Sequence, residues 1–203
     1  MIRWALVSIF LAQAAAVAAQ TPSAADIRAL VDQRVSGLDA YRELLADPDE
    51  VRAVAAMEIM MAADDPALRR MALEFGLFSP APAVRSAALD AYFSSGPTLG
   101  LRLTPDENAN AGYFRNDIAE YSGSIQADGT AFVPVTVGPA DPGRRCYLDA
   151  AGADCVIRNT DSEVSLLLWG NWWKLDMDAE GQLVGSGNSR RGTLMSAVVP
   201  VSF

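Results

Sequence analysis

The apolar positions of the chain follow two different periods, and the change between them falls near Gly96-Pro97. From residue 23 to 94 the apolar residues recur every three to four positions, as on the buried side of a helix. From Pro97 onward they alternate with polar residues, which is typical of strands with one buried face. The pattern predicts an α+β protein, with a small antiparallel helical bundle over residues 21–95 and an antiparallel β-sandwich over residues 96–203.

The helical half is predicted to contain five short helices. They start at Ser23, Leu38, Asp47, Asp65 and Ser79, and Ser23 with Asp26 three residues later resembles a capping box. Gly37 is expected to end the first, and Asp-Pro pairs open the third and fourth, with the Asp as N-cap. Buried residues are expected in four of the five helices. They are Ile27, Leu30 and Val31 in the first; Val51, Val54, Ala55, Ile59 and Met60 in the third; Leu68, Met71, Ala72 and Phe75 in the fourth; and Val84, Ala87, Ala88 and Tyr92 in the fifth.

Three of these helices share a signature, a proline followed by an aliphatic residue and then Arg-x-x-Ala. The arginines are Arg52, Arg69 and Arg85. Over residues 47–93 the signature resembles the helices of HEAT-type repeats, and a stack of such helices usually serves recognition. The resemblance implies structural roles for Asp47, Arg52, Asp65, Arg69 and Arg85. A plain helical bundle remains the alternative, because three signatures are few for a superhelix.

The second half shows short strands separated by turn residues. Asp128-Gly129 predicts a hairpin between residues 122–127 and 130–137, because this pair supplies the positive φ of a tight turn. Gly170-Asn171 predicts another hairpin between residues 164–169 and 172–177, which places Trp169 and Trp172 on either side of the turn. Further strands are expected at residues 98–103, 182–187 and 193–203. Eight to ten such strands fit a sandwich or a small barrel, and the sandwich is the prediction.

The first 20 residues are predicted to be a signal peptide. Arg3 precedes an apolar run from Trp4 to Leu11, and small residues follow up to Gln20. The mature protein is therefore expected to be periplasmic or secreted, with no membrane span after cleavage. In such a compartment the pair Cys146 and Cys155 predicts a disulfide across a hairpin.

Composition argues against several functions. The chain has 25 acidic and 16 basic residues and a formal charge of −9, so it lacks the basic surface that nucleic acids and anionic lipids require. It contains no His, the usual catalytic base and zinc ligand. We therefore expect no enzyme, no catalytic residue, no cofactor and no metal site.

The candidate ligand-binding residues are Trp169, Trp172, Trp173, Asp176 and Asp178. Exposed tryptophans stack on sugar rings, whereas packing in the core is the favoured alternative. The two aspartates resemble the start of a calcium loop, but Gly187 stands where the bidentate Glu belongs, so a β-turn is expected instead.

The expected function is that of an exported, non-enzymatic binding protein of the cell envelope. The helical unit would dock a protein partner, and the β-domain would bind a partner or a glycan. The alternative is a carbohydrate-active hydrolase that uses paired carboxylates near the tryptophans. A purely structural role in an envelope assembly is a third possibility.

Overall fold

The structure is a computed structural model that describes residues 23–160 and 163–203, so the predicted signal peptide lies outside the described residues. The described part contains five helices: α1 Ala24–Leu45, α2 Glu50–Met61, α3 Pro66–Leu77, α4 Pro82–Ser94 and α5 Ala111–Glu120. Its strands are β1 Thr98–Pro105, β2 Ser124–Ile125, β3 Ala131–Asp141, β4 Cys146–Asp149, β5 Cys155–Thr160, β6 Glu163–Leu168, β7 Asn171–Met177, β8 Gln182–Asn188 and β9 Leu194–Pro200. The chain forms two compact units that divide after Gly37.

The first helix is continuous where the sequence predicted a break. α1 runs through Gly37, which is unfavourable in a helix by only about 1 kcal/mol and does not end one that good helix formers surround. Its start is the expected capping box. Asp26 N donates to Ser23 Oγ, and Asp26 Oδ2 accepts from Ser23 N. The apolar positions Ile27, Leu30 and Val31 are exposed rather than buried.

The prediction was right for the buried face of α4 and only partly right for that of α2. In α4, Val84, Ala88 and Tyr92 are buried. In α2, Met60 is buried as predicted, but Val51 is 78% and Ile59 72% exposed. The side that packs against α3 and α4 combines Met60 with three residues that were not predicted, Ala53, Met57 and Met61. Because α2 carries apolar residues on both sides, periodicity alone could not choose between them.

The polar residues of the repeat signature make local structural contacts. Asp49, not Asp47, is the N-cap of α2, and Asp47 instead accepts from Asp49 N and from Arg52 Nε at 2.8 Å. Asp65 caps α3 as predicted. The guanidinium of Arg69 lies 5.2 Å from the ring centre of Phe203.

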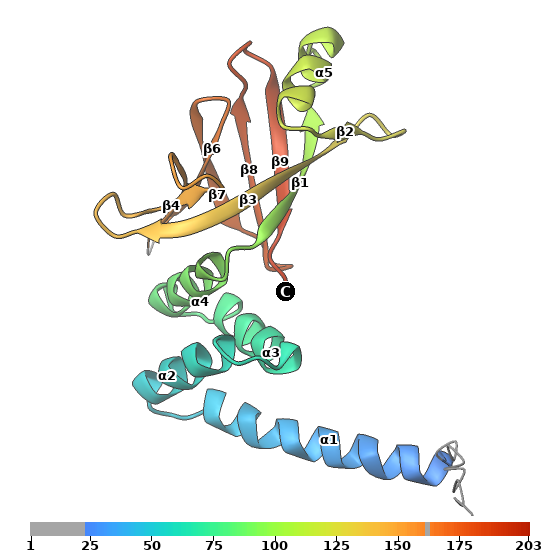
Figure 1. The fold of residues 1–203 in the computed structure, drawn as a ribbon, viewed down its shortest axis with the longest axis vertical. Coiled ribbons are helices and arrows are strands. Elements are labelled where there is room, and N and C mark those ends of the chain that lie inside the picture. Colours follow the sequence, from blue (N-terminus) through green and yellow to red (C-terminus); the bar gives the residue numbers. More distant parts are fainter. Residues whose placement is uncertain (1–22, 161–162) are drawn as a thin grey trace, which may run out of the picture. The chain divides into compact units, whose positions relative to one another are not determined.

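The β-strands form a closed eight-stranded antiparallel barrel, so the predicted sandwich is wrong (Figure 1). The strand order is β1-β9-β8-β7-β6-β5-β4-β3, and β1 pairs with β3 to close the ring, while β2 pairs only with the start of β3. Leu103 of β1 shows the closure directly, since it faces Ala131 of β3 on one side and Ala197 of β9 on the other. Closure removes the unpaired edges that two separate sheets would leave.

Side chains fill the barrel interior. Leu101, Val133, Leu166 and Trp173 all point into one core that also includes Phe93 of α4. An eight-stranded barrel is just narrow enough for its own side chains to occupy the interior. The barrel is therefore a packed core and not a channel.

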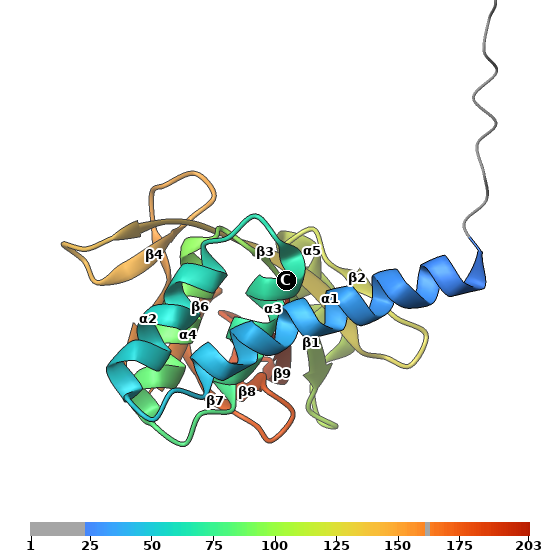
Figure 2. The ribbon, with the colours of Figure 1, turned by 90° about the horizontal axis from the view of Figure 1, so that it is seen from below.

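Helices cover the two ends of the barrel (Figures 1 and 2). α4 lies at one end, where Tyr147 Oη of β4 donates to Asp90 Oδ1 at 2.8 Å. α5 lies at the other end, and the sequence did not predict it, because its residues show no long apolar repeat. Its signals are local: Asn110 accepts from Gly112 N as N-cap, and Phe114 and Ile118 are buried. Helices α2–α4 and the barrel belong to one compact unit, and the predicted domain division at residue 95 stays a prediction.

Candidate binding site

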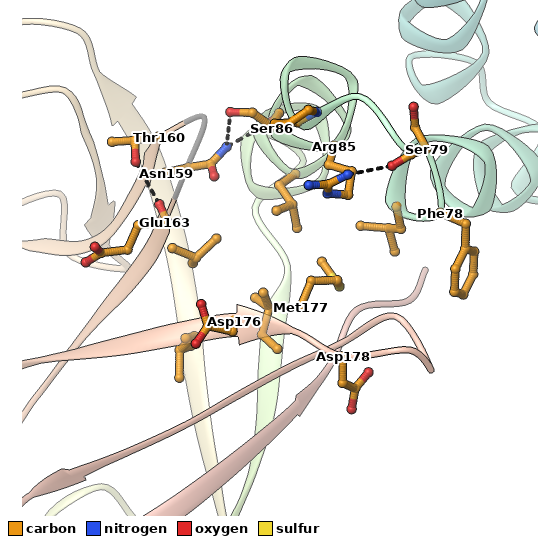
Figure 3. A pocket seen from close by; sticks show the side chains of 16 residues that line it. Phe78, Ser79, Arg85, Ser86, Asn159, Thr160, Glu163, Asp176, Met177 and Asp178 are labelled. Atoms are coloured by element: carbon orange, nitrogen blue, oxygen red, sulfur yellow. Dashed lines mark hydrogen bonds between the residues drawn. The ribbon is translucent and has the colours of Figure 1, made fainter.

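An open cavity of about 430 Å³ lies where α3 and α4 meet the ends of strands β5 to β8 (Figure 3). We call it the barrel-mouth pocket. Residues of α3, the α3–α4 turn and α4 that line it are Leu77, Phe78, Ser79, Pro82, Arg85, Ser86 and Leu89. Strand and turn residues that line it are Asn159, Thr160, Glu163, Val164, Leu175, Asp176, Met177, Asp178 and Leu183. Its volume is within the range of small-ligand sites, which often occupy the mouths of β-barrels.

The floor of the pocket is apolar and rigid. Leu89, Val164, Leu175 and Leu183 are almost fully buried and belong to the common core. Met177, at the end of β7, is partly buried and packs against that core. Since the floor is built from regular elements, its shape does not depend on loop conformation.

Arg85 provides the positive charge on the α4 side. Its Nη1 donates to the carbonyl oxygens of Ser79 at 2.6 Å and Pro80 at 3.1 Å. The two bonds hold the α3–α4 turn, where Ala81 forms no side-chain cap for α4. Within residues 23–160 and 163–203, Nε and Nη2 of Arg85 have no hydrogen-bond partner. The guanidinium is thus fixed in position and retains three N–H donors.

Asn159 joins the barrel to α4 and leaves one acceptor unused. Its Nδ2 donates to Ser86 O at 2.9 Å and lies 3.3 Å from Ser86 Oγ. Its Oδ1 is buried and has no hydrogen-bond partner among the described residues. An unsatisfied buried acceptor costs about 1–3 kcal/mol. The oxygen is buried beside Ser86 and is not exposed to the cavity.

The three carboxylates at the pocket differ in how far they are already engaged. Glu163 accepts from Lys174 Nζ at 2.6 Å and from Ser165 Oγ at 2.7 Å, and these two contacts lower the pKa of Glu163. Asp178 Oδ1 accepts from Glu180 N and Gln182 N, as a turn residue does. Asp176 is exposed and forms no hydrogen bond or ion pair with any residue that the structure describes. Among the described residues, Glu163 alone of the three is in an ion pair, so Asp176 and Asp178 both retain a negative charge that can meet a cation, with Lys174 in the neighbourhood of Asp176.

The tryptophan turn is shifted by one residue from the prediction. The turn residues are Trp169 and Gly170, with φ of 49° and 80°, and Leu168 faces Asn171 across it. The prediction that Trp169 and Trp172 flank the turn is therefore wrong. A bulky residue at positive φ is strained, and two bonds hold it here: Trp169 N donates to Tyr121 Oη and Trp169 Nε1 to Asp117 O.

The five predicted site residues do not form one group. Trp169 and Trp173 are buried in the core, with their ring centres 5.7 Å apart. Trp172 is 37% exposed, and the guanidinium of Arg158 lies 4.3 Å from its ring centre. Asp176 and Asp178 line the barrel-mouth pocket. The pocket also contains Arg85 and Asn159, which the sequence did not single out as ligand-binding because one is in a helix signature and the other in a strand.

A buried carboxylate closes the opposite end of the barrel. Asp117 of α5 is fully buried, and its two oxygens accept from Arg191 Nη1 and Thr193 Oγ1. Arg191 also pairs with Glu120. The cluster joins α5 to the β8–β9 turn, and because both oxygens of Asp117 are occupied, its evident role is structural.

The predicted disulfide between Cys146 and Cys155 is confirmed, and it indicates an oxidising environment outside the cytoplasm. Among the residues that the structure describes, no group of three or more His, Cys, Asp or Glu side chains is placed to hold a metal ion. In the same part of the chain, no helix has the length and apolar character needed to cross a membrane.

No protein-family model, curated protein or solved structure matches the chain.

Proposed function

We propose that the protein is a non-enzymatic binding protein that acts outside the cytoplasm and takes a small ligand in the barrel-mouth pocket. One observation carries the proposal: a cavity of about 430 Å³ joins a rigid apolar floor to polar groups that have hydrogen-bonding capacity left over. Such a combination of apolar surface with a few placed polar groups is typical of ligand sites.

The carboxylates support binding over hydrolysis. A glycosidase needs two carboxyl groups beside the scissile bond, and one of them must hold a proton at working pH. Lys174 and Ser165 lower the pKa of Glu163, which is the opposite of what a general acid needs. Asp178 is engaged by two backbone N–H groups of its turn. Glu163 therefore suits only the ionised role, and Asp176 or Asp178 would have to supply the proton.

The tryptophans support the pocket as the site in preference to a sugar-stacking surface. Two of the three have buried rings, and Arg158 occupies a position over the ring of Trp172. A sugar would have to displace that guanidinium to stack there. The pocket requires no such displacement.

The experiment is a ligand screen read at one methyl group. The protein is labelled with ¹³C at its methionine methyls and mixed with a defined panel of amino acids, dipeptides, monosaccharides, disaccharides and polyamines. A pocket ligand is expected to move the resonance of Met177 and to leave those of Met57 and Met195 in place, because both of these are fully buried in the core.

Two variants check the location. Met177→Trp fills the pocket and should abolish binding, as measured by calorimetry. Ile125→Trp places the same ring on an exposed strand position outside the pocket and should bind normally. If no panel member moves Met177, or if Met177→Trp binds as well as the native protein, the proposal is wrong.

A further inference from the structure

We infer that the ligand of the barrel-mouth pocket is zwitterionic, with an amine and a carboxylate on an apolar body, as in a free amino acid or short peptide with aliphatic side chains. The inference rests on the proposed function, because it assigns a ligand class to the same pocket. It follows from which polar groups remain unused on each wall and from their charge.

The strand wall offers acceptors for the amine. Asp176 is a carboxylate with no hydrogen bond or ion pair inside the described ranges, and it lines the cavity. Asp178 lines the cavity as well, and its Oδ1 accepts only from the backbone of its own turn. Glu163 is already neutralised by Lys174. An ammonium group would therefore find the two lining carboxylates that are in no ion pair, Asp176 and Asp178.

The helix wall offers donors for the carboxylate. Nε and Nη2 of Arg85 are adjacent atoms of a planar guanidinium, and such a pair binds a carboxylate through two parallel hydrogen bonds. The carbonyls of Ser79 and Pro80 already hold the other nitrogen. Because the side chain is fixed before the ligand arrives, little conformational entropy is lost on binding. Figure 3 shows Arg85 on the α4 side of the pocket and Asp176 on the strand side.

The floor selects an apolar body. Leu89, Leu175 and Met177 line the same cavity, so an aliphatic side chain bound there would leave water for a carbon surface. The charges disfavour two other classes. A phosphate or dicarboxylate would be repelled by Asp176, and a polyamine by Arg85, since an unpaired charge in a partly closed site is costly.

The test compares three peptides that differ only at their ends: leucyl-leucine, its N-acetyl derivative and its C-terminal amide. Binding is titrated by the ¹³C-methyl resonance of Met177. Leucyl-leucine should bind, and each capped form should bind about tenfold more weakly, which is the loss expected for one charge-assisted contact.

Asp176→Asn assigns the amine contact. This variant should lower the affinity for leucyl-leucine about tenfold. It should leave the affinity for the N-acetyl peptide unchanged, because that peptide has no ammonium group to contact Asp176. Asp154→Asn, at an exposed turn position outside the pocket, removes the same charge from the chain and should change neither affinity.

The outcomes separate the two proposals. If the capped peptides bind as tightly as leucyl-leucine, or if only sugars or polyamines move Met177, the zwitterion inference is overturned and the proposed function stands. If neither these peptides nor any panel compound moves Met177, both are overturned. If Asp154→Asn lowers the affinity for leucyl-leucine as much as Asp176→Asn does, the inference is also overturned, because the effect would then come from the net charge of the protein.

Discussion

Gly187→Ala is expected to destabilise the barrel, because a methyl group at this position of β8 has no room. An ideal Cβ on Gly187 would lie 2.5 Å from Cδ2 and Cε2 of the Trp173 indole and 2.6 Å from its Cδ1. Real Cβ contacts are essentially never shorter than 3.0 Å. The indole cannot move aside easily, since Trp173 is 1% exposed and packs against Trp169.

The expected loss of unfolding free energy is about 2 kcal/mol. Overpacking of a filled core costs about 1–3 kcal/mol, and three contacts of 2.5–2.6 Å to a buried ring place Gly187→Ala at the upper end of this range. Alanine recovers part of this, because glycine in a strand carries an entropic penalty of roughly 0.5–1 kcal/mol. For a chain of this size, a loss of about 2 kcal/mol lowers Tm by about 4–8 °C.

The assay is urea unfolding followed by near-UV circular dichroism, with Gly100→Ala as the matched control. A Cβ on Gly100 would also be too close to a ring, at 2.7 Å from Phe132. Phe132 is 45% exposed and can swing into solvent, so this variant should lose less than about 0.5 kcal/mol. Introducing Trp173→Phe should reduce the further cost of Gly187→Ala, because the smaller ring leaves space for the methyl.

Two results would refute the reasoning. One is a Gly187→Ala protein within about 0.5 kcal/mol of the native stability. The other is an unchanged cost in the Trp173→Phe background, which would show that the two positions are not coupled.

Three further predictions concern the remaining fold. Cys146→Ser with Cys155→Ser should lower the unfolding free energy by about 2.5 kcal/mol, measured in urea, and an equal stability would show that the crosslink adds nothing. Burial, with a smaller effect of Asp90, raises the pKa of Tyr147 from 10.0 to about 12. The folded state therefore favours the protonated phenol. The contribution of this pKa shift to the free energy of unfolding is complete below pH 10 and falls as pH rises to 12. Tyr147→Phe should therefore reduce the loss of stability between pH 10 and 12. A Cβ added at Gly37 would meet nothing within 4 Å, so Gly37→Ala should stabilise the helix. The free energy of local opening, measured by amide exchange in residues 24–37, should rise by up to about 1 kcal/mol, and faster exchange would contradict this.

Features that depend on neighbouring residues were predictable from the sequence. The disulfide hairpin and the capping box at Ser23 form as expected, and the chain reverses at Asp128-Gly129 as predicted, although the strand before this turn is only Ser124–Ile125. In each case the residues that fix the conformation lie within about ten positions, so no knowledge of the remaining fold is needed.

Features that depend on distant pairing were not predictable. Strand alternation fits a sandwich and a barrel equally, and the choice was made by β1 pairing with both β3 and β9. The hairpin with the tryptophans was misplaced by one residue, because Gly170-Asn171 is a good turn pair locally while the strained Trp169 is held by α5, which the sequence did not reveal. The pocket likewise combines residues of α4 and β5, such as Ser86 and Asn159, that are 73 positions apart.

The pairing of β1 with β9 also fixes when the barrel can be completed. The last strand, Leu194–Pro200, supplies Met195, Ala197 and Val199 to the core and covers one edge of β1. A chain that has not yet emerged in full therefore has an open sheet and an incomplete interior, however much of its N-terminal half is present. Closure of the barrel must await β9, and a chain without this strand has an exposed strand edge through which copies can aggregate. Loss of residues 194–200 should consequently be far more damaging than their share of the chain suggests.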